Sequence, residues 1–313
     1  MQYEGTRVPI HDVGYRRGQP PEGHTWLRWL VIAQAGIRLC WKSSWLRRML
    51  FFAWMPTAVF GFGFFVYEQS FKSAEMRLAV SRALQQLPEE ISPYQDWQTD
   101  PSVARHQVWA LLLMFFFRYP QGMLMVMLVG LIAPPLISQD FRSRAFLLYF
   151  SRPITPVDYV LGKAAVVAAY LAAITLLPAL LLYGIGVMLS PDLSVLWATW
   201  DLPFRVILAS ITLTIPTTAL ALFLSSMTNE SRYAGFAWFA IWILGWVAYF
   251  YLTRIGAGPQ WSMLSLYHLL GRVQLWVFGM PAQDVSAAAL MLVLVTVVSL
   301  IVMMSRISAP MRM

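Results

Sequence analysis

The residues of this 313-residue chain that could carry chemistry are concentrated in one polar connection, residues 139–163. It holds four basic residues and ends in Gly162 and Lys163. A glycine followed by lysine can bind phosphate in a nucleotide-binding loop, but that loop also needs an earlier glycine and a following Ser or Thr. Here Ala164 follows Lys163. The connection therefore does not predict a nucleotide site.

Other chemical sites have little support. The adjacent pair Glu89 and Glu90 lies between two prolines with no histidine beside it. No two histidines have the spacing of metal ligands, and Cys40 is the single cysteine. The four histidines are His11, His24, His106 and His268. We therefore expect no metal, no catalytic residue and no cofactor bound by this chain.

The composition indicates an integral membrane protein. Hydrophobic residues make up 58% of the chain and charged residues 12%, with a mean hydropathy of +0.59. Soluble domains carry about 25% charged residues. The 14 Trp and 13 Tyr fit side chains that favour the membrane interface.

Six apolar segments without a charged residue or histidine are long enough to cross a bilayer, which takes about 20 residues. The segments are Met49–Tyr67, Gln121–Ser138, Ala164–Leu189, Val206–Ser226, Ala234–Leu252 and Ala287–Met304. They predict an all-α membrane fold with six transmembrane helices. A seventh apolar segment, Val108–Phe117, is short and is separated from the second span by Arg118 and Pro120. It is either an interfacial helix or an outward extension of that span.

The remaining segments divide the chain further. Residues 1–48 form a tail in which Trp26–Arg48 predicts an amphipathic helix in the membrane interface, or one packed on a soluble partner. Its apolar face contains Trp26, Leu30, Ala33, Ile37, Trp41 and Trp45. Residues 49–304 form the transmembrane domain, with an outer loop at 68–120 that can hold a helical hairpin. Residues 305–313 form the C-terminal tail.

Before the last span, residues 253–286 contain the apolar runs Trp261–Leu270 and Val273–Phe278, both too short to cross the membrane. Glycines and prolines separate them. We expect two half-length helices that enter the outer leaflet and return; the alternative is a hairpin that lies flat in the interface.

Charge sets the expected orientation. With the N-terminus inside, 15 basic residues lie on the inner side and 8 on the outer side. The positive-inside rule then predicts that both termini face the cytoplasm. We expect the chain in the cytoplasmic membrane.

The 139–163 connection has its own predicted local structure. Pro134–Pro135 should loosen the end of the second span. Ser138 or Asp140 can then cap a new helix, Phe141–Phe150, which Pro153 ends. The result is a short cytoplasmic helix held between two spans by stiff connections.

The stretch DFRSRAFLLYFSRPITPVDYVLGK, residues 140–163, resembles the intracellular loop of ABC-2 permease subunits. The matching residues are Asp140, Leu148, Ser151, Arg152, Pro153, Ile154, Tyr159, Gly162 and Lys163. Many members carry Glu at the position of Asp140. The motif covers about a tenth of the chain, and the outline of six spans agrees over most of the rest.

The resemblance implies a permease that works as a dimer, in which a coupling helix in each copy contacts a separate ATPase. The implied coupling residues are Asp140, Phe141, Arg142, Arg144, Phe146, Tyr149, Arg152, Pro153, Tyr159, Gly162 and Lys163. Other roles stay open for some of them. The arginines can bind anionic lipid, the aromatic rings can pack under the spans, and Lys163 can extend to the interface.

The implied function is outward transport of a lipophilic or amphipathic substrate, with ATP and magnesium held by the partner ATPase. The implied partners are that ATPase, a second permease copy, membrane lipid and an accessory or periplasmic subunit, with no nucleic acid. Two alternatives are a secondary transporter and a membrane-embedded enzyme. The first usually needs ionisable groups inside the spans, and the second needs carboxylate or histidine clusters near the bilayer.

Overall fold

The computed structural model describes residues 28–143, 154–256 and 259–308, and within these ranges every regular element is a helix. Six helices or continuous helix pairs are long and apolar enough to cross a membrane. They are α2 (Ser44–Gln69), α5–α6 (Arg105–Arg142), α8–α9 (Pro156–Leu189), α11 (Leu202–Ser226), α12 (Ser231–Arg254) and α14 (Val285–Ser308). The prediction of an all-α protein with six spans is confirmed.

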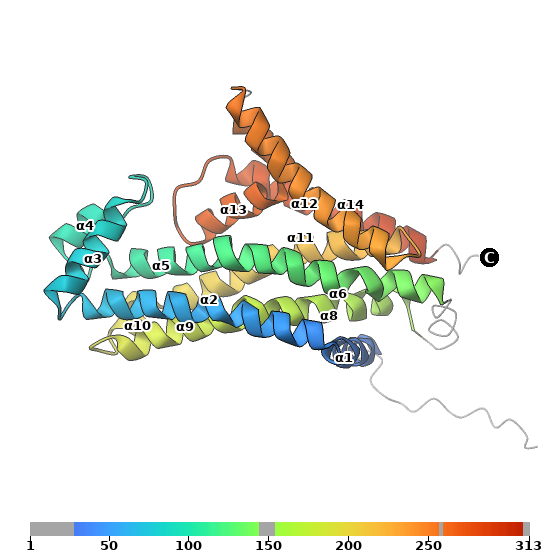
Figure 1. Ribbon diagram of the computed structural model, residues 1–313, viewed down its shortest axis with the longest axis horizontal. Helices are drawn as coiled ribbons and strands as arrows, with labels where there is room; N and C mark the ends of the chain where they lie inside the picture. Colours follow the sequence, from blue (N-terminus) through green and yellow to red (C-terminus); the bar gives the residue numbers. More distant parts are fainter. Residues whose placement is uncertain (1–27, 144–153, 257–258, 309–313) are drawn as a thin grey trace, which may run out of the picture.

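Most of the spans run along the long axis of the molecule (Figure 1). The end of α6, the start of α8 and the end of α14 lie at one end, and α3 and α4 lie at the other. Helix α1 (Arg28–Trp41) crosses the first of these ends and is seen nearly along its axis. Helix α12 diverges from the other spans, so its outer half projects from the bundle.

The second span is longer than the sequence predicted. Helix α5 (Arg105–Phe116) continues through a π-helical turn, Phe117–Gln121, into α6 (Gly122–Arg142). A π turn inserts one residue and so accommodates Pro120, which lacks an N–H. The apolar segment before Arg118 is therefore an outward extension of the span. Arg118 lies inside this span, so the expectation that no span contains a charged residue is wrong.

Helix α6 also continues through Pro134–Pro135 to Arg142. Phe141 and Arg142 therefore belong to α6 and do not begin a new helix; the rest of the predicted helix Phe141–Phe150 lies outside the described residues. Ser225 of α11 stabilises the double proline: its Oγ donates to the Pro134 carbonyl at 2.6 Å and accepts the N–H of Ile137 at 3.1 Å. A side chain from another span thus supplies hydrogen bonds at the point where the prolines interrupt the helix.

The N-terminal helix ends earlier than predicted. Helix α1 ends at Trp41, and Ser43 caps α2 by accepting the N–H of Leu46 at 3.4 Å. The segment 44–48 thus belongs to the first span. The face of α1 is also only partly as predicted, because Ala33 is buried whereas Leu30 and Trp41 are exposed. The buried side of α1 packs on α8.

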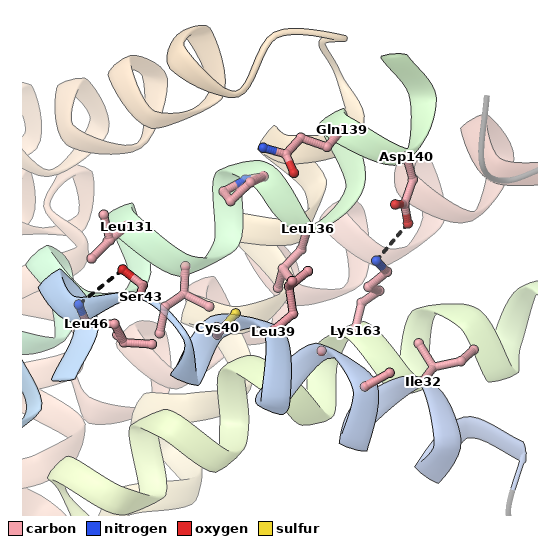
Figure 2. Close-up of a pocket in the computed structure, with 14 residues that line it drawn as sticks. Ile32, Leu39, Cys40, Ser43, Leu46, Leu131, Leu136, Gln139, Asp140 and Lys163 are labelled. Carbon is pink, nitrogen blue, oxygen red and sulfur yellow. Dashed lines mark hydrogen bonds and ion pairs between the residues drawn. The ribbon is translucent and has the colours of Figure 1, made fainter. Parts of the chain in front are cut away.

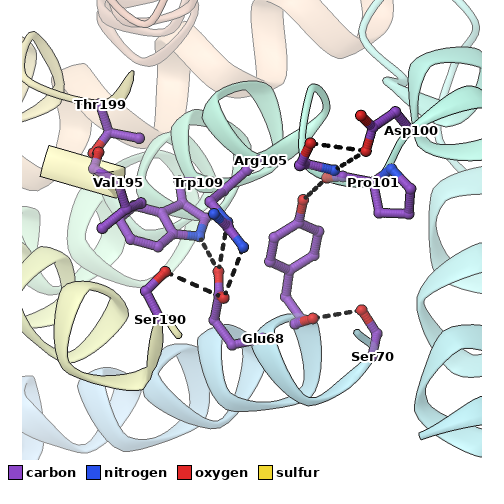
Figure 3. A network of polar contacts seen from close by, with 11 residues as sticks. Glu68, Ser70, Asp100, Pro101, Arg105, Trp109, Ser190, Val195 and Thr199 are labelled. Carbon is purple, nitrogen blue, oxygen red and sulfur yellow. Dashed lines mark hydrogen bonds and ion pairs between the residues drawn. The ribbon is translucent and has the colours of Figure 1, made fainter. Parts of the chain in front are cut away.

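The end of the bundle opposite α1 carries a small helical hairpin, α3 (Ala74–Gln85) and α4 (Tyr94–Thr99). A buried carboxylate ties the span ends below it (Figure 3). Glu68 of α2 pairs with Arg105 at 3.2 Å and accepts the indole N–H of Trp109 at 3.2 Å. Ser190, after α9 (Leu176–Leu189), donates to Glu68 at 3.4 Å. The third span bends at Thr175, where α8 (Pro156–Ile174) gives way to α9.

The segment before the last span forms a 3₁₀ helix, Pro259–Leu264, followed by α13 (Leu266–Val277). Two half-length helices were expected with a break near Gly271. Instead α13 continues through Gly271, and this glycine faces the guanidinium of Arg118, where a Cβ would overlap it. Helix α13 packs against α11, α12 and α14.

Candidate functional site

The candidate site lies where α6 ends and α8 begins. Lys163 Nζ lies 2.7 Å from Asp140 Oδ2, and Tyr159 donates its hydroxyl to the same oxygen at 2.7 Å. The side chains of Lys163 and Asp140 are 10% and 16% exposed. This low exposure means that Lys163 does not extend to the interface, so that alternative is wrong. A shielded ion pair with a third hydrogen bond fixes the two helices relative to each other.

The start of α8 is rigid for local reasons. Thr155 accepts the N–H of Asp158 at 3.1 Å, and Asp158 accepts the N–H of Thr155 at 3.1 Å. Pro156 occupies the first helical position, where its fixed torsion suits a helix. This reciprocal cap fixes the point at which the 144–153 segment joins the third span.

Helix α1 packs directly on this site. A Cβ added at Gly162 would lie 2.6 Å from the Cβ of Ile32 and 2.9 Å from the carbonyl oxygen of Trp29. Tyr170 of α8 donates its hydroxyl to the carbonyl of Ile37 at 2.9 Å. Gly162 therefore allows α1 to approach α8 closely, and a movement of α8 would carry α1 with it.

A second ion pair joins this site to the next inner connection. Arg142 lies 3.1 Å from Glu230, which immediately precedes α12. The two side chains are 66% and 37% exposed, so water screens this pair. Phe141 is half-buried against the core. The remaining predicted coupling residues lie outside the described residues; they are Arg144, Phe146, Tyr149, Arg152 and Pro153.

A cavity of about 360 Å³ separates α1 from α6 beside the ion pair (Figure 2). Its wall is mostly apolar, with Leu39, Leu131 and Leu136 on it, and Asp140 and Lys163 lie at one end. Cys40 also lines it. Burial raises the pKa of the Cys40 thiol, although Lys163 opposes this shift, so the thiol stays protonated at neutral pH.

Sequence reasoning found Asp140, Tyr159, Gly162 and Lys163, and the structure brings these four together. It missed Glu230 and Ser225, which reach the same region from segments about 90 residues away. Neither stands in a motif, so no local signal identifies them. Within the described residues no group of three or more metal-ligating side chains occurs.

The site is built as a mechanical connection: two span ends held by a shielded ion pair, a capped helix start and a helix packed across them. A family model described as ABC-2 family transporter protein matches residues 38–265, which include Asp140, Tyr159, Lys163 and Glu230 but only the last residues of α1. No curated protein matches the chain.

Proposed function

The chain belongs to the ABC-2 family of transporter proteins, and from that premise we propose that it is the permease subunit of an ATP-driven exporter. In this proposal it moves a lipophilic or amphipathic substrate outward across the cytoplasmic membrane. A separate ATPase subunit binds ATP and magnesium, and this chain binds no cofactor. Both termini face the cytoplasm.

The observation that carries the proposal is the contact between Asp140, Tyr159 and Lys163. These residues lie at the two ends of the segment that resembles the coupling loop. Because they are shielded and hydrogen-bonded, a force on the 144–153 segment would reach α6 and α8 together. The reciprocal cap at Thr155 holds the first turn of α8 in place.

The inner surface offers a second path for the same force. Arg142 and Glu230 join the end of α6 to the start of α12. Helix α12 is the most exposed span: 11% of its most apolar 18-residue stretch is buried, against 61% for α11. An inner partner that moved α6 would therefore also move α12, which packs on α6 through the buried Trp238. The exposed face of α12 favours a second permease copy as partner.

The position of Arg118 inside a span weakens one argument against secondary transport. It does not favour that alternative, because a guanidinium stays protonated and cannot carry a coupling proton. The polar side chains at the inner end also form no catalytic cluster among the described residues. Neither alternative gains an observation that supports it.

The proposal is tested by purifying the complex from its native host. We expect an ATPase subunit in the complex and no ATP hydrolysis by this chain alone. A photoreactive residue at position 146 should capture the ATPase, and Phe146→Ala with Tyr149→Ala should weaken its association while the permease stays folded. Pro153→Gly should preserve assembly but lower transport per ATP hydrolysed. A native complex without an ATPase, or capture only from the 227–233 connection, would refute the proposal.

A further inference from the structure

Arg118 lies near the middle of the membrane. Its neighbours in the second span fix its depth against α2: the rings of Phe116 and Phe60 are 5.6 Å apart, and Gln121 donates to the carbonyl of Ala53 at 3.0 Å. At about 1.5 Å per residue, Ala53 and Phe60 are roughly 14 and 24 Å from the first residue of α2. The hydrocarbon core is about 30 Å thick, so Arg118 lies within it.

In the part of the chain that the structure describes, no carboxylate pairs with this cation. Among the described residues Arg118 has no ion pair; it donates to the carbonyl oxygen of Tyr267 in α13, and its Cζ lies 3.7 Å from the centre of the Tyr267 ring. The guanidinium also lies against Gly271, one turn further along α13. A guanidinium has five N–H donors, and the Tyr267 carbonyl takes only part of this capacity.

The same residue is only half-buried within this copy. A charged side chain in the middle of a membrane protein faces the protein interior or a water-filled route, because contact with hydrocarbon is too unfavourable. Tyr119, next in the chain, is 58% exposed. The exposed side of Arg118 must therefore face a polar space or a second copy, and it cannot face lipid tails.

The surroundings combine this positive charge with aromatic surface. Tyr267 stacks on the guanidinium, and His268 lies between Tyr267 and Tyr249, with ring centres 5.4 and 3.6 Å away. Tyr249 belongs to α12, the exposed span. The cluster thus offers charge, hydrogen-bonding atoms and flat apolar surface together.

We propose that Arg118 binds the anionic group of the transported substrate, so that the substrate is an anionic amphiphile: a carboxylate, sulfate or phosphate attached to an apolar body. The guanidinium provides a planar set of donors for the anionic oxygens, and the tyrosines contact the apolar part. This inference rests on the proposed transport function and adds the substrate class. The headgroup of a resident lipid shares this chemistry, so the test must separate the two.

The test measures binding to the full chain in phosphatidylcholine nanodiscs, with empty nanodiscs as background. The probes are dodecyl phosphate and dodecyltrimethylammonium, which share an alkyl chain and differ in charge. We expect dodecyl phosphate to bind at least about tenfold more tightly than dodecyltrimethylammonium, because only the phosphate can accept a charge-assisted hydrogen bond. Arg118→Gln should abolish that difference, and Arg118→Lys should keep most of it.

Arg205→Gln is the matched control. Arg205 also donates to a carbonyl of α13, that of Val277 at 3.0 Å, but it is neutralised by Asp201 at 2.6 Å. Its loss should loosen α13 without altering the preference for the anionic probe. If Arg118→Gln does not fold, Gly271→Ala replaces it, because the added methyl group displaces the guanidinium; the same loss of preference is expected.

Equal binding of the two probes, or a preference that survives Arg118→Gln, would overturn the proposal. With the native complex, ATP and magnesium should release dodecyl phosphate if the site belongs to the transport route. Retention of the probe through ATP hydrolysis would assign the site to a resident lipid and overturn the substrate assignment. Absence of an ATPase from the native complex would refute the proposed function but not the binding of the anionic probe. The two outcomes are distinguishable because probe binding is measured on this chain alone.

Discussion

Asp140 and Lys163 stand 23 positions apart in the sequence, and their charged atoms lie 2.7 Å apart between the end of one span and the start of the next. The segment that joins them includes the predicted contact with an ATPase. Tyr159 holds the same carboxylate oxygen. The pair therefore closes the loop at its base, and each span end is positioned by the other.

The pair should be energetically coupled. Removing one partner of a fully buried ion pair destabilises a protein by about 3–5 kcal/mol. Because Asp140 and Lys163 are slightly exposed, we expect a loss at the lower end of that range. Asp140→Asn and Lys163→Met should each lower the midpoint of thermal unfolding in detergent. The double variant should lose less than the sum of the two. Additive losses would show that the two side chains do not stabilise each other.

The exposed pair of Arg142 and Glu230 serves as the internal comparison. Exposed ion pairs contribute at most about 1 kcal/mol. Glu230→Gln should therefore leave the unfolding midpoint almost unchanged. A loss as large as that of Asp140→Asn would contradict the assignment of Asp140 and Lys163 as the principal connection at this end.

Gly162 should be intolerant of even a methyl group. The added Cβ would meet backbone and a β-branched side chain of α1, so α1 must move or the site must strain; overpacking of this kind costs about 1–3 kcal/mol. Gly162→Ala should lower thermal stability and expose α1 to limited proteolysis. The control is Gly184→Ala in α9, where nothing lies within 4 Å of the new atom. Since alanine favours helix over glycine, this control should be neutral or slightly stabilising; equal damage from both would refute the packing argument.

Features that depend on residues close together in the sequence could be predicted, and features that depend on contacts between distant segments could not. The spans and the loop motif are local patterns, so they were predictable. Arg118 and Pro120 looked like the end of a helix because a proline removes one hydrogen bond, yet the π turn absorbs that loss within one span. Pro134–Pro135 looked like an end for the same reason, yet α6 continues through it, and Ser225 of another helix hydrogen-bonds to α6 just after the prolines. The approach of Lys163 to Asp140 likewise depends on how two spans pack, which no local pattern specifies.

The orientation of the chain in the membrane can be tested by cysteine labelling. Cys40 is the single cysteine, so Cys40→Ser provides a background without thiols. Gln86→Cys, exposed at the end of α3, should react with a membrane-impermeant maleimide in intact cells. Ser143→Cys, exposed at the end of α6, should react only after permeabilisation. The reverse pattern would place both termini outside and would invalidate the positive-inside argument.

The double proline in α6 gives the sharpest test of how the second span stays continuous. Ser225 accepts the N–H groups of Ile137 and Ser138 at 3.1 Å and donates to the Pro134 carbonyl at 2.6 Å. Ser225→Ala removes this hydroxyl and its hydrogen bonds to α6, each of which contributes about 0.5–1.5 kcal/mol, so the unfolding midpoint should fall.

Ser226→Ala is the matched control for that change. Ser226 is equally buried, but its hydroxyl donates at 2.7 Å to the carbonyl of Phe223 in its own helix, which a helix turn can spare. Its loss should have little effect on stability. We also expect Ser225→Ala to increase hydrogen exchange at the amides of Ile137 and Ser138, because both N–H groups donate to the Ser225 hydroxyl. If both alanine variants are equally stable, and exchange at these amides is unchanged, α6 spans its double proline without help from α11.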